Sequence, residues 1–153
     1  MSFPDIQKLL RNVDAILLEK GSRDEALLAI AQLLSEKVEH YNWVGFYIAN
    51  KDEPMLHLGP YVGAPTDHTD IPFGKGVCGQ VAESGDALVI QDVNAESNYL
   101  SCSIDVKSEV VFPINKDGKF VAQLDIDSHA LSPFGDEDTE LLETICQRLE
   151  KLF

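Results

Sequence analysis

A strand–turn–strand pattern near the C-terminal end of the chain constrains the fold more than any other feature. Residues 110–114 and 120–127 are rich in β-branched and other apolar side chains, and the polar segment 116–119 lies between them. Two such runs joined by a short polar segment containing Asp117-Gly118 favour a tight turn, which places neighbouring strands in antiparallel order. The chain is therefore expected to contain an antiparallel sheet.

Hydrophobic periodicity predicts helices before and after the strands. Apolar residues recur at three- and four-residue spacing over 6–17 and 27–38, while Gly21 and the capping residue Ser22 separate these two helices. A further helix is expected from Asp136 onward, because acidic residues crowd its first turn and an apolar stripe follows. Between these helices we expect strands at 43–48, 55–58 and 87–91, a short helix at 77–83, and a strand break at Gly59-Pro60.

This order of elements predicts a single α+β domain over residues 1–153. Strands joined by hairpins favour an antiparallel sheet with one covered face, and the N- and C-terminal helices are expected to pack together on that face. A ligand pocket is expected on the opposite face, under the segment 71–100.

Composition and charge exclude several classes of partner. The formal net charge is −14 over 153 residues, and a field of this sign repels nucleic acid and anionic lipid surfaces. The sequence has no apolar run long enough to span a membrane, and its start does not resemble a secretory signal. We therefore expect a cytoplasmic protein whose three cysteines are reduced at rest.

The cysteines differ in their surroundings. Cys102 lies in a polar segment just before a predicted strand, as an accessible nucleophilic thiol would. Cys78 lies between Gly76 and Gly79, which suit either a reactive turn or a purely structural one. Cys146 follows Ile145 on the last predicted helix and is expected to be buried and inert.

Three carboxylates fall within predicted strands. Asp125 and Asp127 alternate with apolar residues, so both side chains are expected on one face of the sheet, and Glu109 begins the neighbouring strand. Like charges on one face need a partner or a raised pKa, which favours a pocket, although a solvated sheet face is the alternative. Cysteine and histidine spacings typical of zinc sites do not occur, and no bound metal is expected.

Five sequence blocks together resemble a GAF domain, a small-molecule-binding module of many sensor proteins. They are YNWVGFY at 41–47, IPFGKGVCG at 71–79, SEVVFP at 108–113, LDIDS at 124–128 and FGDED at 134–138. On a stand-alone domain that also carries Cys78 and Cys102, these blocks resemble the free methionine-(R)-sulfoxide reductases. A non-catalytic GAF sensor that binds a small ligand in the same pocket is the alternative function.

The resemblance implies a thiol-dependent reaction on free methionine sulfoxide. Cys102 would be the nucleophile that becomes a sulfenic acid, and Cys78 would resolve it as a disulfide that thioredoxin reduces. No cofactor would be bound, and the chain would form a homodimer. The resemblance implies that Glu109 is the acid and that Asp125 and Asp127 bind the substrate amine. Trp43 and Tyr47 would form the wall around the thioether methyl. Backbone N–H groups at Leu100 and Ser101 would bind the substrate carboxylate.

The chain departs from the family pattern at two points. Many family members carry a further cysteine near the position of His68, but this chain has none there. Cys78 is therefore the evident resolving cysteine here. The family run after the nucleophile is usually Cys-Asp-Ala, whereas residues 102–105 are CSID.

Overall fold

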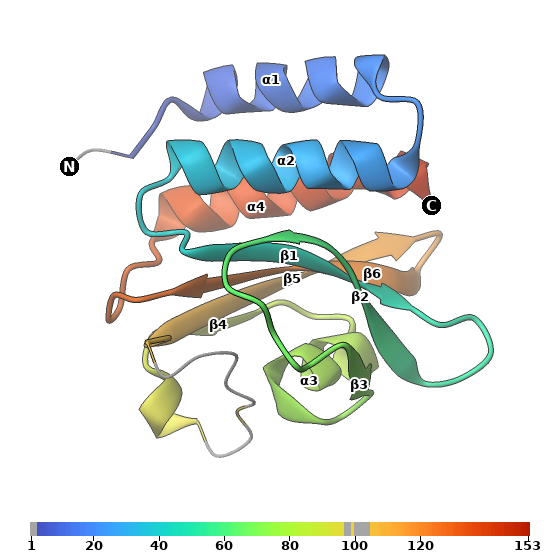
Figure 1. Cartoon of the computed structure of the whole chain (residues 1–153), viewed down its shortest axis with the longest axis vertical. Coiled ribbons are helices and arrows are strands. Elements are labelled where there is room, and N and C mark those ends of the chain that lie inside the picture. The colour runs from blue at the N-terminus through green and yellow to red at the C-terminus, as the bar shows by residue number, and fades with distance from the viewer. Residues whose placement is uncertain (1–2, 97–98, 100–104) are drawn as a thin grey trace.

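The computed structural model describes residues 3–96, 99 and 105–153. In chain order its elements are α1 (Ile6–Glu19), α2 (Arg23–Lys37), β1 (Trp43–Ala49), β2 (Met55–Val62), β3 (Asp70–Pro72), α3 (Gly76–Ser84), β4 (Leu88–Ile90), the 3-10 turn η1 (Val93–Ala95), β5 (Ser108–Lys116), β6 (Lys119–Ser128), α4 (Asp136–Leu149) and the 3-10 turn η2 (Glu150–Leu152) (Figure 1).

The six strands form one sheet in the order β3-β2-β1-β6-β5-β4, and every neighbouring pair is antiparallel. The predicted hairpin is β5–β6, which turns at Asp117 and Gly118, both at positive φ. This turn geometry matches the right-handed twist of the flanking strands. The sequence-based prediction of an antiparallel α+β fold is confirmed.

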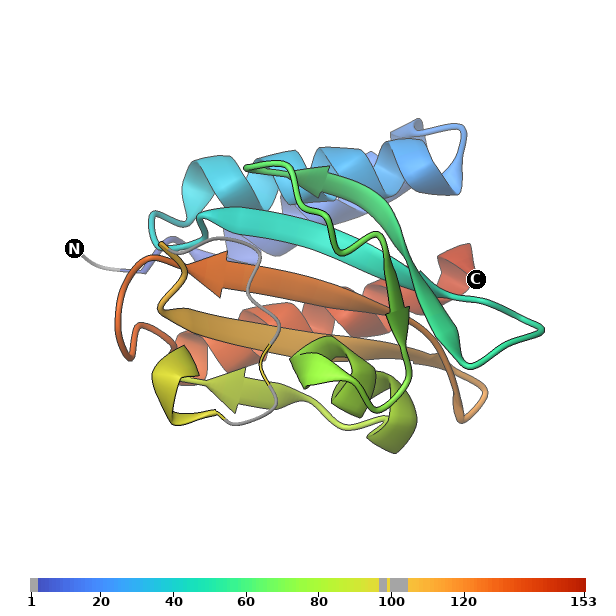
Figure 2. The ribbon, with the colours of Figure 1, turned by 60° about the horizontal axis from the view of Figure 1, so that its bottom comes forward.

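Helices cover the sheet in layers (Figures 1 and 2). Helices α2 and α4 lie against one face, α3 lies against the opposite face, and α1 packs on α2 and α4 as an outer layer. The three long helices are thus on one side, as predicted, but α1 reaches the sheet only through the other two. The reason is the area of the face: α2 and α4 side by side already cover it.

Strand alternation divides the core between the two faces. On the helix side, Val44, Phe46, Leu124 and Ile126 pack against the stripes of α2 and α4. On the other side, a smaller apolar cluster joins β1 and β5 to α3, through residues that include Tyr47, Val77 and Val111. The candidate polar residues of β5 and β6 lie within this second layer.

The sequence-based expectation that the strand breaks at Gly59-Pro60 was wrong. Strand β2 continues through Gly59-Pro60 to Val62, because the extra residue is accommodated as a bulge: Leu58 pairs with Tyr47, yet Tyr61 pairs with Gly45. A proline is tolerated at such an irregularity, where no ladder hydrogen bond requires its missing N–H. The short strand β3, which pairs with the start of β2, was not predicted from the sequence.

The cap predicted for α2 is present, and α1 has a similar cap that was not predicted. The Ser22 hydroxyl accepts a hydrogen bond from the Glu25 N–H at the start of α2, and Asp5 caps α1 in the same way. Within the described part of the chain, no helix combines the length and the apolar character needed to cross a bilayer.

Candidate active site

Helix α3 carries Cys78 to the sheet. The close approach of the helix requires Gly79, because a Cβ there would lie 2.6 Å from the Pro72 carbonyl oxygen. The Cys78 side chain projects from the first turn of α3 onto the sheet and is almost fully buried. The glycines around Cys78 therefore position the thiol by allowing the helix to pack tightly, which the sequence alone left open.

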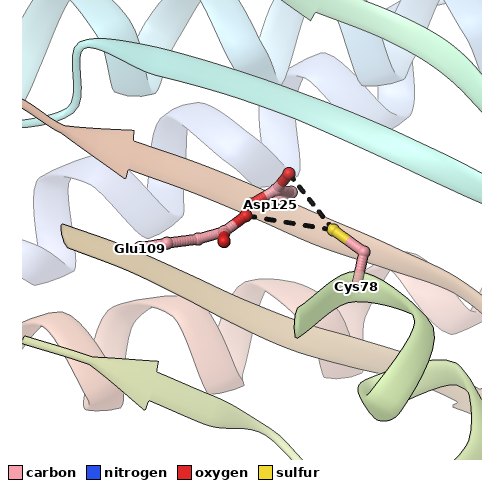
Figure 3. A group of neighbouring side chains, drawn as sticks. All are labelled: Cys78, Glu109 and Asp125. Atoms are coloured by element: carbon pink, nitrogen blue, oxygen red, sulfur yellow. Dashed lines mark hydrogen bonds between the residues drawn. The ribbon is translucent and has the colours of Figure 1, made fainter. Parts of the chain in front are cut away.

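Two carboxyl groups face this thiol from neighbouring strands (Figure 3). The Sγ atom of Cys78 lies 3.3 Å from Oδ2 of Asp125 on β6 and 3.9 Å from Oε2 of Glu109 on β5. The two acids are diagonal neighbours, since Asp125 pairs with Val111 and Glu109 pairs with Asp127 across the β5–β6 ladder. Both carboxyl groups are buried. The structure thus brings Cys78, Asp125 and Glu109 together on one face of the sheet.

Burial controls the protonation of Cys78, Asp125 and Glu109. The pKa of the Cys78 thiol is raised well above its ordinary value, first by burial and then by the charges of Asp125 and Glu109. Burial also raises the pKa of Asp125, although hydrogen bonds with Glu109 and Cys78 oppose that rise. Two buried carboxylates this close would repel each other, so burial favours one proton shared between Asp125 and Glu109 beside a neutral thiol.

A small cavity lies at this cluster, beneath the segment that leads into α3. Its volume, measured as the space open to the centre of a water molecule, is about 10 Å³, so it has room for about one water. Its lining residues are Tyr47, His68, Ile71, Gly76, Val77, Cys78, Glu109 and Asp125.

Trp43 and Asp127 line a second, larger cavity instead. It offers about 100 Å³ on the same measure and includes Asn42, Ala64 and Asp105 in its wall. Trp43 stacks on Tyr61 with ring centroids 5.2 Å apart. The residues assigned to one substrate site by resemblance are thus divided between two hollows on the same sheet face.

Two aromatic residues of β1 hold the segment between β2 and β3 against the sheet by hydrogen bonds. The Tyr47 hydroxyl donates to the His68 carbonyl oxygen at 2.8 Å, and Trp43 Nε1–H donates to the Ala64 carbonyl oxygen at 2.9 Å. Sequence analysis assigned Tyr47 and Trp43 to the pocket wall but missed this second role, because no local pattern links residues that are 21 positions apart.

Several predicted site residues lie outside the described residues: Cys102, Leu100 and Ser101. Their roles and the Cys78–Cys102 disulfide stay predictions. Cys146 is buried as predicted, with its Sγ atom 3.8 Å from the Phe112 carbonyl oxygen, and burial raises its thiol pKa.

A second buried polar group was missed by sequence reasoning. Asp138 on α4 accepts a hydrogen bond from the Tyr41 hydroxyl at 2.7 Å and lies 2.7 Å from His40 Nε2. These partners are about a hundred residues away in the chain, so no motif spacing could reveal them. The group joins the start of α4 to the segment before β1.

Known proteins resemble the chain over most of its length. The GAF domain family profile matches residues 22–152. Protein YtsP of Bacillus subtilis is 37% identical over 147 residues, covering 96% of this chain and 90% of that protein. The free methionine-R-sulfoxide reductase of Escherichia coli is 33% identical over 144 residues, covering 94% of this chain and 86% of that protein.

A solved structure supports the same relationship. The free methionine-R-sulfoxide reductase from Neisseria meningitidis, determined in complex with its substrate, superimposes with a TM-score of 0.91 at 31% sequence identity. The match covers 100% of this chain and 94% of that chain. The profile match, the full-length relatives and the shared antiparallel sheet agree with the resemblance inferred from the sequence: the chain belongs to the GAF domain family.

Proposed function

We propose that this protein is a thiol-dependent oxidoreductase that reduces free L-methionine-(R)-sulfoxide to methionine. The observation that carries the proposal is the buried contact of the Cys78 thiol with the carboxyl groups of Asp125 and Glu109. The proposal is supported by full-length relatives that are named for this activity. A GAF domain that only senses a ligand has no need for a thiol against an acid pair.

The chemistry assigns each group a step. The Cys102 thiolate attacks the sulfoxide sulfur while Glu109 protonates the sulfoxide oxygen. The hydroxyl group then moves from the substrate sulfur to the Cys102 sulfur as the bond between the two sulfurs breaks, so that methionine leaves and Cys102 is a sulfenic acid. The Cys78 thiol then attacks the Cys102 sulfur, water leaves and a disulfide forms. Asp125 Oδ2, 3.3 Å from Sγ, is placed to accept the thiol proton in that step.

The raised pKa of Cys78 suits a resolving cysteine rather than the first nucleophile. A thiol that stays protonated does not compete for the sulfoxide, and it becomes reactive when the neighbouring carboxylate takes its proton. Asp125 and Asp127 would hold the substrate ammonium.

Substrate entry requires the cavity to enlarge. A hollow with room for about one water-sized particle does not admit an amino acid, so the segment above it must move away from the sheet. In our proposal this movement breaks the hydrogen bonds from Tyr47 and Trp43 and merges the two hollows, which brings Trp43 and Asp127 to the same substrate.

The electron donor is proposed to be a thioredoxin, and the cytoplasm is the compartment where this donor and reduced cysteines coexist. Such an activity would recover methionine oxidised under oxidative stress. We further propose that the chain is a homodimer, and light scattering at micromolar concentration measures its mass.

The test is NADPH consumption by a thioredoxin system with free methionine-(R)-sulfoxide as substrate. Turnover is expected with the free (R) sulfoxide but not with the (S) diastereomer or an N-acetylated sulfoxide, which lacks the ammonium group. Cys102→Ser should abolish turnover, whereas Cys78→Ser should release about one methionine per chain and then stop. Binding of the sulfoxide without reduction would refute the enzymatic function and favour the alternative, a ligand sensor.

A further inference from the structure

We infer that the reduced protein binds one zinc ion through Cys78, Glu109 and Asp125, and that this ion blocks the resolving cysteine while it is bound. One ligand atom from each of the three buried residues lies within 4.8 Å of the other two. Thiolate and carboxylate donors together suit Zn²⁺, which binds Cys, His and carboxylate ligands in tetrahedral sites. Sequence spacing gave no sign of this set, because the residues come from three separate elements.

The distances fit one tetrahedral ion. Zinc–sulfur bonds of about 2.3 Å and zinc–carboxylate bonds of about 2.0 Å, at a tetrahedral angle, place sulfur and oxygen about 3.5 Å apart. The two separations from Cys78 Sγ are 3.3 Å to Asp125 and 3.9 Å to Glu109. Changes of a few tenths of an ångström therefore complete the three protein bonds, and the fourth position is left for water.

The size of the cavity fits an ion better than an organic ligand. The cavity has room for about one water, and Cys78, Glu109 and Asp125 themselves line it. The opened form that we propose for substrate binding is not needed for an ion. The closed site thus has the donors and the space for a metal before any substrate enters.

The second oxygen of Asp125 also favours a bound cation. Asp125 is almost fully buried, and apart from the neighbouring Glu109 carboxyl group its Oδ1 atom has no hydrogen-bond partner among the described residues. A buried polar atom without a partner costs about 1–3 kcal/mol. A bound cation supplies the missing attraction for this carboxylate and offsets the accumulated negative charge of the cluster.

The exchange of protons balances the charge. The ion replaces the proton of the Cys78 thiol and the proton shared by the carboxyl pair, and both are released to solvent. No electron is transferred, so neither an oxidant nor a reductant is needed. A Cys78 sulfur that is bound to zinc cannot attack a sulfenic acid, and in that sense the inference rests on the proposed reductase function.

The test measures metal binding. Reduced protein is titrated with Cd²⁺, which reports a metal–thiolate bond by its ultraviolet charge-transfer band, and with Zn²⁺ by calorimetry. We expect one ion per chain in the wild type. The matched control Cys146→Ser should bind equally, because that thiol packs against the Phe112 carbonyl on the other side of the sheet.

Variants of the three ligands identify the site. Cys78→Ser should lose the charge-transfer band, and Glu109→Gln and Asp125→Asn should each weaken Zn²⁺ binding at least tenfold, because amides are poorer ligands than carboxylates. Cys102→Ser should keep the band. Loss of the band in Cys102→Ser with its retention in Cys78→Ser, or wild-type affinity in both carboxyl variants, would overturn the assignment.

A measurement on the wild type avoids dependence on mutant folding. One equivalent of Zn²⁺ should slow iodoacetamide labelling of Cys78 at least tenfold, as read by mass spectrometry of the Cys78 peptide, and removal of the ion by a chelator should restore it. Unchanged labelling would refute the site. Since these readouts need no turnover, a protein that binds zinc but reduces no sulfoxide refutes the reductase alone, whereas turnover without zinc binding refutes the metal site alone.

Discussion

Gly45 shows how one residue without a side chain preserves the site. A Cβ at this position would lie 2.4 Å from the Trp43 ring and 2.7 Å from the Tyr61 Cβ. Gly45 also pairs with Asp125 across β1 and β6. The absence of a side chain therefore leaves room for the Trp43 ring to stack on Tyr61 beside the strand that carries Asp125.

Gly45→Ala should displace the indole ring and destabilise the protein by about 1–3 kcal/mol, the usual cost of overpacking. Trp43 is the single tryptophan, so its fluorescence emission reports the displacement, and urea unfolding gives the stability. Gly21→Ala is the matched control, since nothing lies within 4 Å of a Cβ there. Unchanged emission and stability in Gly45→Ala would contradict the packing argument.

The two carboxyl groups at Cys78 should be separable by steady-state kinetics. Glu109→Gln removes the proposed proton donor and should lower kcat by about 10²–10⁴-fold with little change in KM. Asp125→Asn removes a charge for the substrate ammonium and also the acceptor of the Cys78 thiol proton, so it should raise KM and lower kcat together. A Glu109→Gln enzyme with unchanged kcat would refute the assignment of Glu109 as the acid.

At the scale of elements, the start of α4 depends on Asp138. Its carboxylate accepts hydrogen bonds from the Gly135 N–H at 2.8 Å and from Tyr41, and it also contacts His40. Burial pushes the pKa of Asp138 up, but the hydrogen bonds from His40, Gly135 and Tyr41 together outweigh burial and hold the pKa below its ordinary value. One side chain thus caps the helix and connects it to the segment before β1.

Asp138→Asn should lower the free energy of unfolding by about 1–3 kcal/mol at pH 7, because the amide cannot accept all of these hydrogen bonds. A carboxyl group with a lowered pKa stabilises the fold above its unfolded pKa of about 3.9, and that contribution is lost as the pH falls through the folded value. Urea unfolding should therefore show the difference between wild type and variant constant above about pH 5 and shrinking below about pH 4. The exposed Asp136→Asn is the control, with an expected effect of about 0.5 kcal/mol from the helix dipole. A difference that persists undiminished in acid would contradict the role of the charge.

For the whole molecule, the dominant electrostatic feature is the formal net charge of −14. Charges of one sign repel each other in the folded state more than in the expanded chain, and salt screens this repulsion. We expect the free energy of unfolding to rise by on the order of 1 kcal/mol between low salt and about 0.5 M sodium chloride. Urea unfolding at several salt concentrations measures the change, and a fall in stability with salt would show that favourable ion pairs outweigh the repulsion.

Local patterns in the sequence determined the elements and the face of the sheet on which the candidate residues lie. Alternation of Asp125 and Asp127 with Leu124 and Ile126 is a property of neighbouring residues, and it placed both acids opposite the long helices. The cap of α2 and the β5–β6 turn follow from interactions within a few residues, which is why they were predictable.

Only the tertiary structure decided which residues meet. Cys78 contacts Glu109 and Asp125, which are 31 and 47 positions away, because α3 packs tightly onto β5 and β6. The continuation of β2 through Gly59-Pro60 depends on hydrogen bonding to β1, which outweighs the local preference to end the strand. The physical reason is the same in each case: contacts between distant segments depend on the packing of whole elements, and no local spacing in the sequence records that packing.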